Sequence, residues 1–186
     1  GTEKIEEEIA LFFPQARIER MDLDATRSRK AYERLIARFE MKESDILVGT
    51  QMVSKGLDFD NVKLVGIMNA DTMLNYPDFR AYERSYQLMS QVSGRAGRKN
   101  GRGMVIIQTS SHNHPVISQV VHNDYQAMYA GQLEERNRFR YPPFSRLVKI
   151  ILKHRIQETL DQAAVFLAQQ LRNTVKETVM GPEYPL

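Results

Sequence analysis

The sequence predicts an α/β fold whose mainly parallel sheet is covered by helices on both faces. Three apolar runs, at 46–48, 62–68 and 104–108, are continuous rather than alternating, which is typical of strands buried on both faces. Segments with helical periodicity separate these runs, as the crossovers between parallel strands require. A hydrophobic share of 42% over 186 residues is ample for the core of one such domain.

The N-terminal segment predicts a helix from Thr2 to Pro14, because Thr2 is a suitable N-cap and acidic residues fill the first turns. Its apolar stripe consists of Ile5, Ile9, Phe12 and Phe13. A short strand is expected at 17–21, and a turn at 22–26 leads into a second helix. The apolar face of that second helix consists of Tyr32, Leu35, Ile36 and Phe39.

A longer helix is expected from about 78 to 94. Its apolar positions recur with helical spacing and are Phe79, Tyr82, Tyr86 and Met89. After Pro115 the pattern is helical again to about Arg138, and the break at Tyr141-Pro142-Pro143 interrupts it.

We therefore expect one full domain at 1–130 and a second unit at 131–186. The second unit begins with a linker helix and continues with a strand at 147–152 and an amphipathic helix at about 158–176. One strand and one helix cannot bury both faces of either element, so this α+β unit is expected to be truncated.

The composition excludes several classes of protein. No apolar run approaches the about 20 residues that span a bilayer, and no signal pattern opens the chain, so we expect a soluble protein with no membrane partner. The absence of cysteine excludes disulfides and thiolate zinc sites, which fits a cytoplasmic location. The four histidines lack the spacing of metal ligands, so we expect no metal site within the chain.

The net charge of +3 is concentrated in the C-terminal part. Residues 1–130 hold 17 basic and 17 acidic side chains, whereas residues 131–186 hold 9 and 6. The basic residues there are interleaved with aromatic ones and include Arg136, Arg138, Arg140, Arg146, Lys149, Lys153 and Arg155. Such interleaving suits a nucleic-acid backbone and its bases, and it fits a solvated surface equally well.

The most informative motif is Gln91-Val-Ser-Gly94-Arg95-Ala-Gly97-Arg98, at the end of the long predicted helix. It sets an amide and two guanidinium groups around a pair of glycines. Arginines three residues apart on a helix share a face and can reach one anion together, while glycine lets the backbone approach a phosphate closely. The alternative is a basic helix end whose charges are solvated or contact the last carbonyls.

A second motif leaves the strand at 46–48 at its carboxyl end, where open α/β sheets bind ligands. Thr50, Gln51 and Lys55 could donate hydrogen bonds to nucleic-acid phosphates, and Asp58 could accept one from a ribose hydroxyl. Taken by itself, the segment could equally be a plain connecting loop.

Together the two motifs resemble motifs V and VI of superfamily 2 helicases in order and spacing. Longer blocks are similar to one family of that superfamily, the primosomal protein N′ (PriA) helicases. The blocks are Gly1-Thr-Glu3, Asp22-x-Asp24-x-Thr26, Asp45 to Phe59, Pro77 to Arg84, Gln91 to Arg98 and Tyr141-Pro-Pro-Phe144. Leu57 stands where that family often has His, a difference we expect to be tolerated.

The resemblance implies that residues 1–130 form the second RecA-like lobe of a helicase, with ATP and Mg²⁺ held against a first lobe. Arg95 and Arg98 would act as fingers on the γ-phosphate, and Gln91 would sense the nucleotide or position the attacking water. The implied nucleotide contacts are Gly56, Asp58 and Gly94, and the implied DNA contacts are Thr2, Thr50, Gln51 and Lys55.

The resemblance also implies 3′→5′ unwinding at stalled or branched forks by a monomer that restarts replication. The expected partners are branched and single-stranded DNA, single-stranded-DNA-binding protein and primosome proteins. The implied first lobe, with its phosphate loop and Mg²⁺-binding motif, and a zinc module just upstream of Gly1 are not in this chain. We therefore expect the isolated chain to hydrolyse no ATP.

Two rival interpretations remain. One is a lobe of another superfamily 2 motor, such as a nucleotide-excision-repair helicase, against which the blocks at 77–84 and 141–144 argue. The other is a non-catalytic nucleic-acid-binding module, which would have no use for Gln91, Arg95 and Arg98 together.

Overall fold

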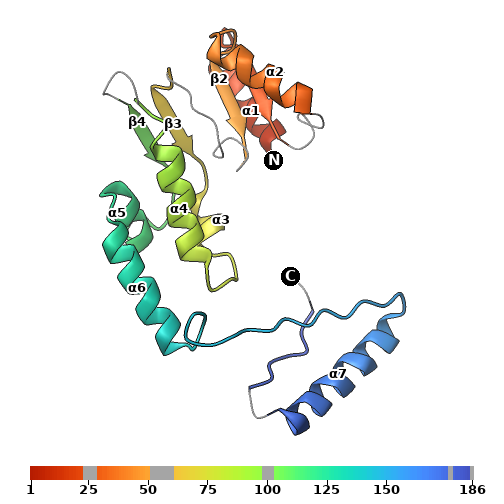
Figure 1. Cartoon of the computed structure of the whole chain (residues 1–186). Coiled ribbons are helices and arrows are strands. Elements are labelled where there is room, and N and C mark those ends of the chain that lie inside the picture. Colours follow the sequence, from red (N-terminus) through yellow and green to blue (C-terminus); the bar gives the residue numbers. More distant parts are fainter. Residues whose placement is uncertain (23–28, 51–60, 98–102, 176–177, 185–186) are drawn as a thin grey trace. The chain divides into compact units, whose positions relative to one another are not determined.

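The computed structural model describes residues 1–22, 29–50, 61–97, 103–175 and 178–184 (Figure 1). The chain divides into two compact units, Gly1–Phe144 and Ser145–Leu186. Each unit is described by itself below.

The first unit begins with a parallel strand pair and two helices, whose bounds are α1 (Thr2–Phe12), β1 (Ile18–Met21), α2 (Arg29–Glu40) and β2 (Ile46–Gly49). The register runs from Ile18 opposite Ile46 to Met21 opposite Gly49. Met21 and Leu35 are buried between the strands and α2, because the apolar face of α2 turns inward as its periodicity predicts. The side chains that pack against them are Tyr32, Ile36, Phe39, Leu47 and Val62.

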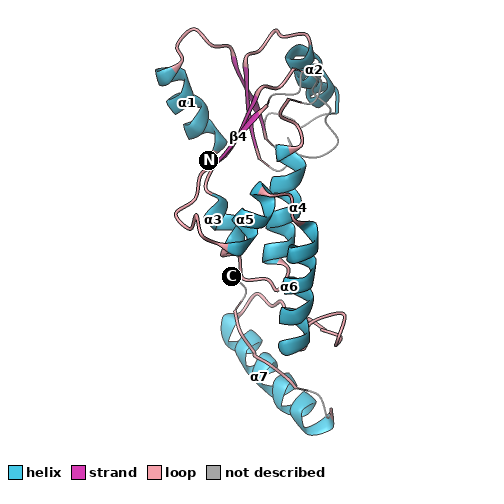
Figure 2. Ribbon diagram, turned by 90° about the vertical axis from the view of Figure 1, so that its left-hand side faces the viewer, coloured by secondary structure: helices cyan, strands magenta, loops and turns pink. Residues whose placement is uncertain are grey.

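A second parallel pair and four helices complete this unit. Their bounds are β3 (Leu64–Ile67), α3 (Ala70–Leu74), α4 (Ala81–Ser93), β4 (Met104–Ile107), α5 (Pro115–Val121) and α6 (Tyr125–Arg138). The register runs from Leu64 opposite Met104 to Ile67 opposite Ile107. Figure 2 shows α5 and α6 beside α4, and these helices contact one another. Their shared core is made of Ile67, Ala70, Leu74, Tyr86, Met89, Val116, Ile117, Val120 and Met128.

The predicted α/β class is confirmed, and the strands expected at 46–48, 62–68 and 104–108 are β2, β3 and β4. Within the described ranges, however, the strands form two separate pairs instead of one sheet. The single helix expected after Pro115 was wrong, because α5 ends and α6 begins around Asn123 and Asp124. Asn123 adopts a left-handed conformation with φ of 52°, and the Asp124 carboxylate accepts the Ala127 N–H at 2.9 Å as an N-cap.

Helix α6 packs with the first unit, so the compact units divide after Phe144 and not at the expected 130/131. Met128 is 3% exposed in the core shared with α4 and α5, and Arg136 forms an ion pair with Glu83 of α4. A division at 130/131 would cut α6 in two and separate Arg136 from Glu83.

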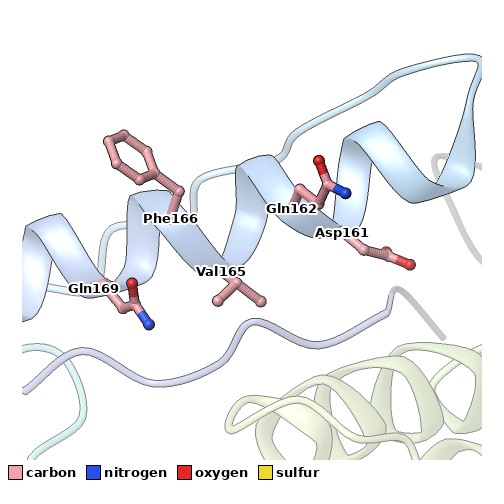
Figure 3. Close-up of a pocket in the computed structure, with 5 residues that line it drawn as sticks. All are labelled: Asp161, Gln162, Val165, Phe166 and Gln169. Atoms are coloured by element: carbon pink, nitrogen blue, oxygen red, sulfur yellow. The ribbon is translucent and has the colours of Figure 1, made fainter.

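The second unit contains helix α7 (Gln157–Thr174), which confirms the helix expected at 158–176. The strand expected at 147–152 was wrong, because that segment pairs with no strand in the described part of the chain and its apolar side chains are exposed. An open hollow along α7 is lined by Asp161, Gln162, Val165, Phe166 and Gln169 (Figure 3). Among the described residues, no helix has the length and apolar character needed to cross a membrane.

Candidate functional site

Helix α4 presents the predicted phosphate residues at its C-terminal end. The helix forms because Ala81, Ser85, Tyr86 and Met89 recur at helical spacing and are all buried, Tyr86 and Met89 in the core shared with α5 and α6. The opposite face is left to solvent, and Gln91 is exposed on it. Core packing of one face therefore determines where Gln91 points.

A tight turn continues α4 and carries Arg95. The Gly94 N–H donates to the Ser90 carbonyl at 3.0 Å, and the Arg95 N–H donates to the Val92 carbonyl at 3.0 Å. The second of these bonds joins residues three apart, as in a 3₁₀-helix, and it tightens the last turn of α4. Arg95 is half-buried, one helical turn beyond Gln91. The structure thus brings Gln91 and Arg95 to one helix end, while Arg98 lies outside the described residues.

Two backbone contacts fix this turn. The Gly97 N–H donates to the Val62 carbonyl at 2.8 Å, in the segment that leads into β3. At Gly103, just before β4, an added Cβ would lie 2.2 Å from the carbonyl carbon of Ala96 and 2.4 Å from the Gly97 nitrogen. The turn at 94–97 is therefore packed closely against the segments that lead into β3 and β4.

The glycines of the motif have different requirements. Gly97 has φ of 72°, a conformation that favours glycine. Gly94 has φ of −66°, and a Cβ there would be 3.5 Å from the Ser90 carbonyl oxygen, an ordinary contact. The backbone requires glycine at 97 and 103 and not at 94, so a nucleotide contact at Gly94 stays a prediction. Sequence reasoning missed Gly103, which only the fold brings to the turn.

The carboxyl edge of the β1–β2 pair gathers two predicted DNA residues. Met21 and Gly49 are paired across the strands, so Asp22 and Thr50 follow at the same edge. Thr50 is exposed. The Thr2 hydroxyl donates to the Asp22 carboxylate at 2.7 Å, and the Arg20 Nε lies 3.2 Å from the same oxygen. The start of α1 is therefore held at the edge of the strand pair where Thr50 follows β2.

The N-cap prediction for Thr2 was wrong. Gly1 is the N-cap of α1 and Thr2 is the first helical residue. The hydroxyl of Thr2 is turned to Asp22 because that carboxylate follows β1 at the same edge. Four other predicted residues, Gln51, Lys55, Gly56 and Asp58, lie outside the described part of the chain.

A polar cluster at the carboxyl edge of the β3–β4 pair was not predicted. Asp71 accepts the Ser110 N–H and the Thr109 hydroxyl, each at 2.8 Å, and these bonds hold the pKa of Asp71 below its usual range. The Gln108 side-chain oxygen accepts the Asn69 N–H at 3.1 Å. Polar residues directly after two predicted strands were the available signal. Because these polar groups bond to one another, the cluster ties the two strand ends together.

Comparison with known proteins gives one domain family and several relatives. Residues 2–100 match the family described as the helicase conserved C-terminal domain. The chain is 45% identical over 188 residues to the replication restart protein PriA of Bacillus subtilis (strain 168), covering 98% of this chain and 23% of that protein. It is 40% identical over 186 residues to PriA of Synechocystis sp., covering 98% and 22%. The PriA of Treponema pallidum is 44% identical over 164 residues, covering 88% and 25%. The chain spans about a quarter of the length of these relatives.

Proposed function

Because this chain belongs to the helicase conserved C-terminal domain family, we propose that it is the second motor lobe of an ATP-dependent DNA helicase. We propose further that the whole protein restarts replication at stalled or branched forks. The relatives at 40–45% identity carry the name replication restart protein, which favours this role over that of an excision-repair motor. The observation that carries the proposal is the end of α4, where Gln91 lies one helical turn before Arg95 and the turn that carries Arg95 is fixed by Val62 and Gly103.

In this proposal Arg95 and Arg98 reach the γ-phosphate of ATP from across a lobe interface, and Gln91 orients the nucleotide or the attacking water. A guanidinium keeps its charge at any working pH and matches phosphate oxygens with a planar fork. Arginine fingers in other phosphoryl-transfer enzymes contribute roughly 10³ to 10⁵ in rate. Gly94, Gly56 and Asp58 contribute the remaining nucleotide contacts.

The donor set of the α4 end fits a polyphosphate and does not fit a bare cation. Residues 91–97 carry the side-chain amide of Gln91 and the guanidinium of Arg95 and no carboxylate, while the backbone N–H groups of 94–97 already donate to protein carbonyls. Mg²⁺ prefers oxygen ligands, mostly carboxylates and water, so its protein ligands would come from the other lobe. When bound, Mg²⁺ neutralises charge on the phosphates, and this chain adds the arginines.

The DNA backbone is proposed to bind at the carboxyl edge of the β1–β2 pair, through Thr50, Gln51 and Lys55. Thr2 takes part through the N-terminus of α1, whose first N–H groups have no helical acceptor and attract phosphate. Its hydroxyl is engaged with Asp22 and instead fixes that helix start at the edge where Thr50 follows β2. Closing and opening of the lobes would shift this contact along one strand in the 3′→5′ direction.

The proposal also extends to partners. Branched and single-stranded DNA would be the substrates, and single-stranded-DNA-binding protein and primosome proteins would bind the whole protein. Exposed basic side chains of the second unit, such as Arg146, Lys149 and Lys153, provide charge for a DNA backbone.

ATP hydrolysis by the full-length protein, with and without forked DNA, tests the proposal. Forked DNA should stimulate turnover strongly, and Arg98→Ala should abolish the stimulated turnover while DNA affinity stays within about twofold. The control is Arg34→Ala, which removes an exposed guanidinium from α2. Near wild-type turnover by Arg98→Ala would refute the finger role, and a wild-type protein without DNA-stimulated turnover would refute the motor.

A further inference from the structure

Two sequence blocks that the motor assignment leaves without a role meet in the first unit. Phe79, from the block just before α4, stacks on Tyr141, from the block where the chain leaves α6. Their ring centroids are 5.1 Å apart and their planes differ by 19°. The segment before α4 is therefore packed against the segment that follows α6, near the C-terminal end of the first unit.

Arg136, near the C-terminal end of α6, joins these parts through one guanidinium group. It forms an ion pair with the carboxylate of Glu83, on the first turns of α4. It also lies 5.2 Å from the centre of the Phe79 ring and donates to the Pro142 carbonyl at 3.5 Å. Figures 1 and 2 both show α6 running alongside α4, in agreement with the contacts between them.

Burial separates Arg136 from the other basic residues of this stretch. Its side chain is 17% exposed and that of Glu83 is 32% exposed, whereas Arg138 is exposed and its guanidinium lies 5.5 Å from the centre of the Phe139 ring. Arg136 therefore belongs neither to a solvated surface nor to a free nucleic-acid surface, the two roles that its sequence context left open. Removing one partner of a partly buried ion pair leaves the other charge uncompensated.

The Glu83 contact leads along α4 toward the phosphate motif. The second oxygen of Glu83 accepts the Gln87 side-chain amide at 3.0 Å, and Gln91 lies one further turn along. Residues four apart on a helix are neighbours on its surface. The helix of 13 residues is a short rigid rod, so a rotation or tilt at its first turns moves the turn at 94–97 as well.

We propose that Arg136 is a positioning residue for the motor: through Glu83 and Phe79 it fixes the orientation of α4 and so the placement of Gln91 and Arg95. The inference rests on the proposed function for its catalytic consequence. Lysine cannot replace it, because an ammonium lacks the planar group whose two terminal nitrogens reach Glu83 and Pro142 while its face covers the Phe79 ring.

The test uses the full-length protein with Arg136→Ala, with Arg136→Lys and with a charge-reversal double variant that combines Glu83→Arg and Arg136→Glu. Arg138→Ala is the matched control, because Arg138 lies on the same helix two residues after Arg136 and is exposed. Arg136→Ala should lower kcat of DNA-stimulated ATP hydrolysis about 10- to 100-fold, the range that a displacement of about 1 Å produces. The KM for ATP and the affinity for DNA should stay within about twofold. Arg136→Lys should behave like Arg136→Ala. The charge-reversal double variant re-forms the ion pair but not the stacking on Phe79, so it should recover kcat only in part, to at least about threefold above Arg136→Ala.

Hydrogen exchange gives a readout that does not depend on turnover. In Arg136→Ala the amides of Gly94 to Gly97 should exchange faster than in wild type, while the β1–β2 pair exchanges as before. Arg138→Ala should change neither region. If the wild-type protein shows no DNA-stimulated turnover, the proposed function fails. The hydrogen-exchange rates alone then decide whether Arg136 positions the turn.

Three results would overturn the inference. The first is kcat within twofold of wild type in Arg136→Ala. The second is a loss confined to DNA affinity, with kcat restored at saturating DNA, which would make Arg136 a DNA contact. The third is faster hydrogen exchange over the whole first unit, with no recovery of kcat in the charge-reversal double variant. That result would make the ion pair a contributor to stability only.

Discussion

Replacing Gly103 by alanine is expected to displace the turn that carries Arg95. The new Cβ would lie 2.2, 2.4 and 2.6 Å from three backbone atoms of Ala96 and Gly97. These atoms cannot swing away as a side chain would, so the turn must retreat by about 1 Å to reach an ordinary contact of about 3.4 Å. Such overpacking costs about 1 to 3 kcal/mol of the free energy of unfolding.

Gly94→Ala is the matched control, since it adds the same methyl group to the same turn. At Gly94 the Cβ would lie 3.5 Å from its nearest neighbour, in a right-handed helical conformation that alanine adopts readily. Its effect on the free energy of unfolding should therefore be at most about 1 kcal/mol, and stabilising. Denaturant unfolding of both variants, followed by circular dichroism, measures the difference. Equal stability of Gly103→Ala and wild type, or a larger loss in Gly94→Ala, would refute this account of the turn.

Three further outcomes are expected. Met89→Ala, at a side chain that is 0% exposed, should lower the free energy of unfolding by about 2 to 5 kcal/mol, measured by the same unfolding curves; a loss below about 1 kcal/mol would contradict the packing of α4. The Arg17 guanidinium lowers the pKa of Asp45 from 3.8 to about 2, so the pair stabilises the fold above that ordinary value and the contribution is lost as the pH falls toward about 2. The difference in unfolding midpoint between wild type and Asp45→Asn should therefore shrink over that range, and a difference that grew on acidification would show the opposite linkage. The isolated chain should hydrolyse no ATP above background, and turnover that persists after further purification would show that the lobe does not need a partner lobe.

The parts of the fold that could be predicted are those that local pattern determines. Strands β2, β3 and β4 are continuous apolar runs, and α4 has apolar side chains at helical spacing, so each signal lies within the element itself. The segment at 147–152 is equally apolar, but a strand also needs a neighbour for its backbone hydrogen bonds, and an apolar run does not reveal whether one is present.

The site shows the same division between local and long-range information. Gln91 and Arg95 could be placed together because their motif is contiguous, and their role at a nucleotide stays a prediction. The contacts that fix the turn at 94–97 come from Val62 and Gly103, which the motif does not include. The local signal at Thr2 was misleading, because a residue type that often caps helices uses its hydroxyl for a tertiary hydrogen bond to Asp22.

The central claim is that the end of α4 faces a nucleotide. The turnover number of Arg95→Ala in the full-length protein, at saturating ATP and forked DNA, tests it most directly. A fall of about 10³-fold or more is expected, with unchanged DNA affinity and an unfolding midpoint close to that of the Arg34→Ala control. Turnover within about threefold of wild type would contradict the claim, because it would mean that this guanidinium plays no part at the γ-phosphate.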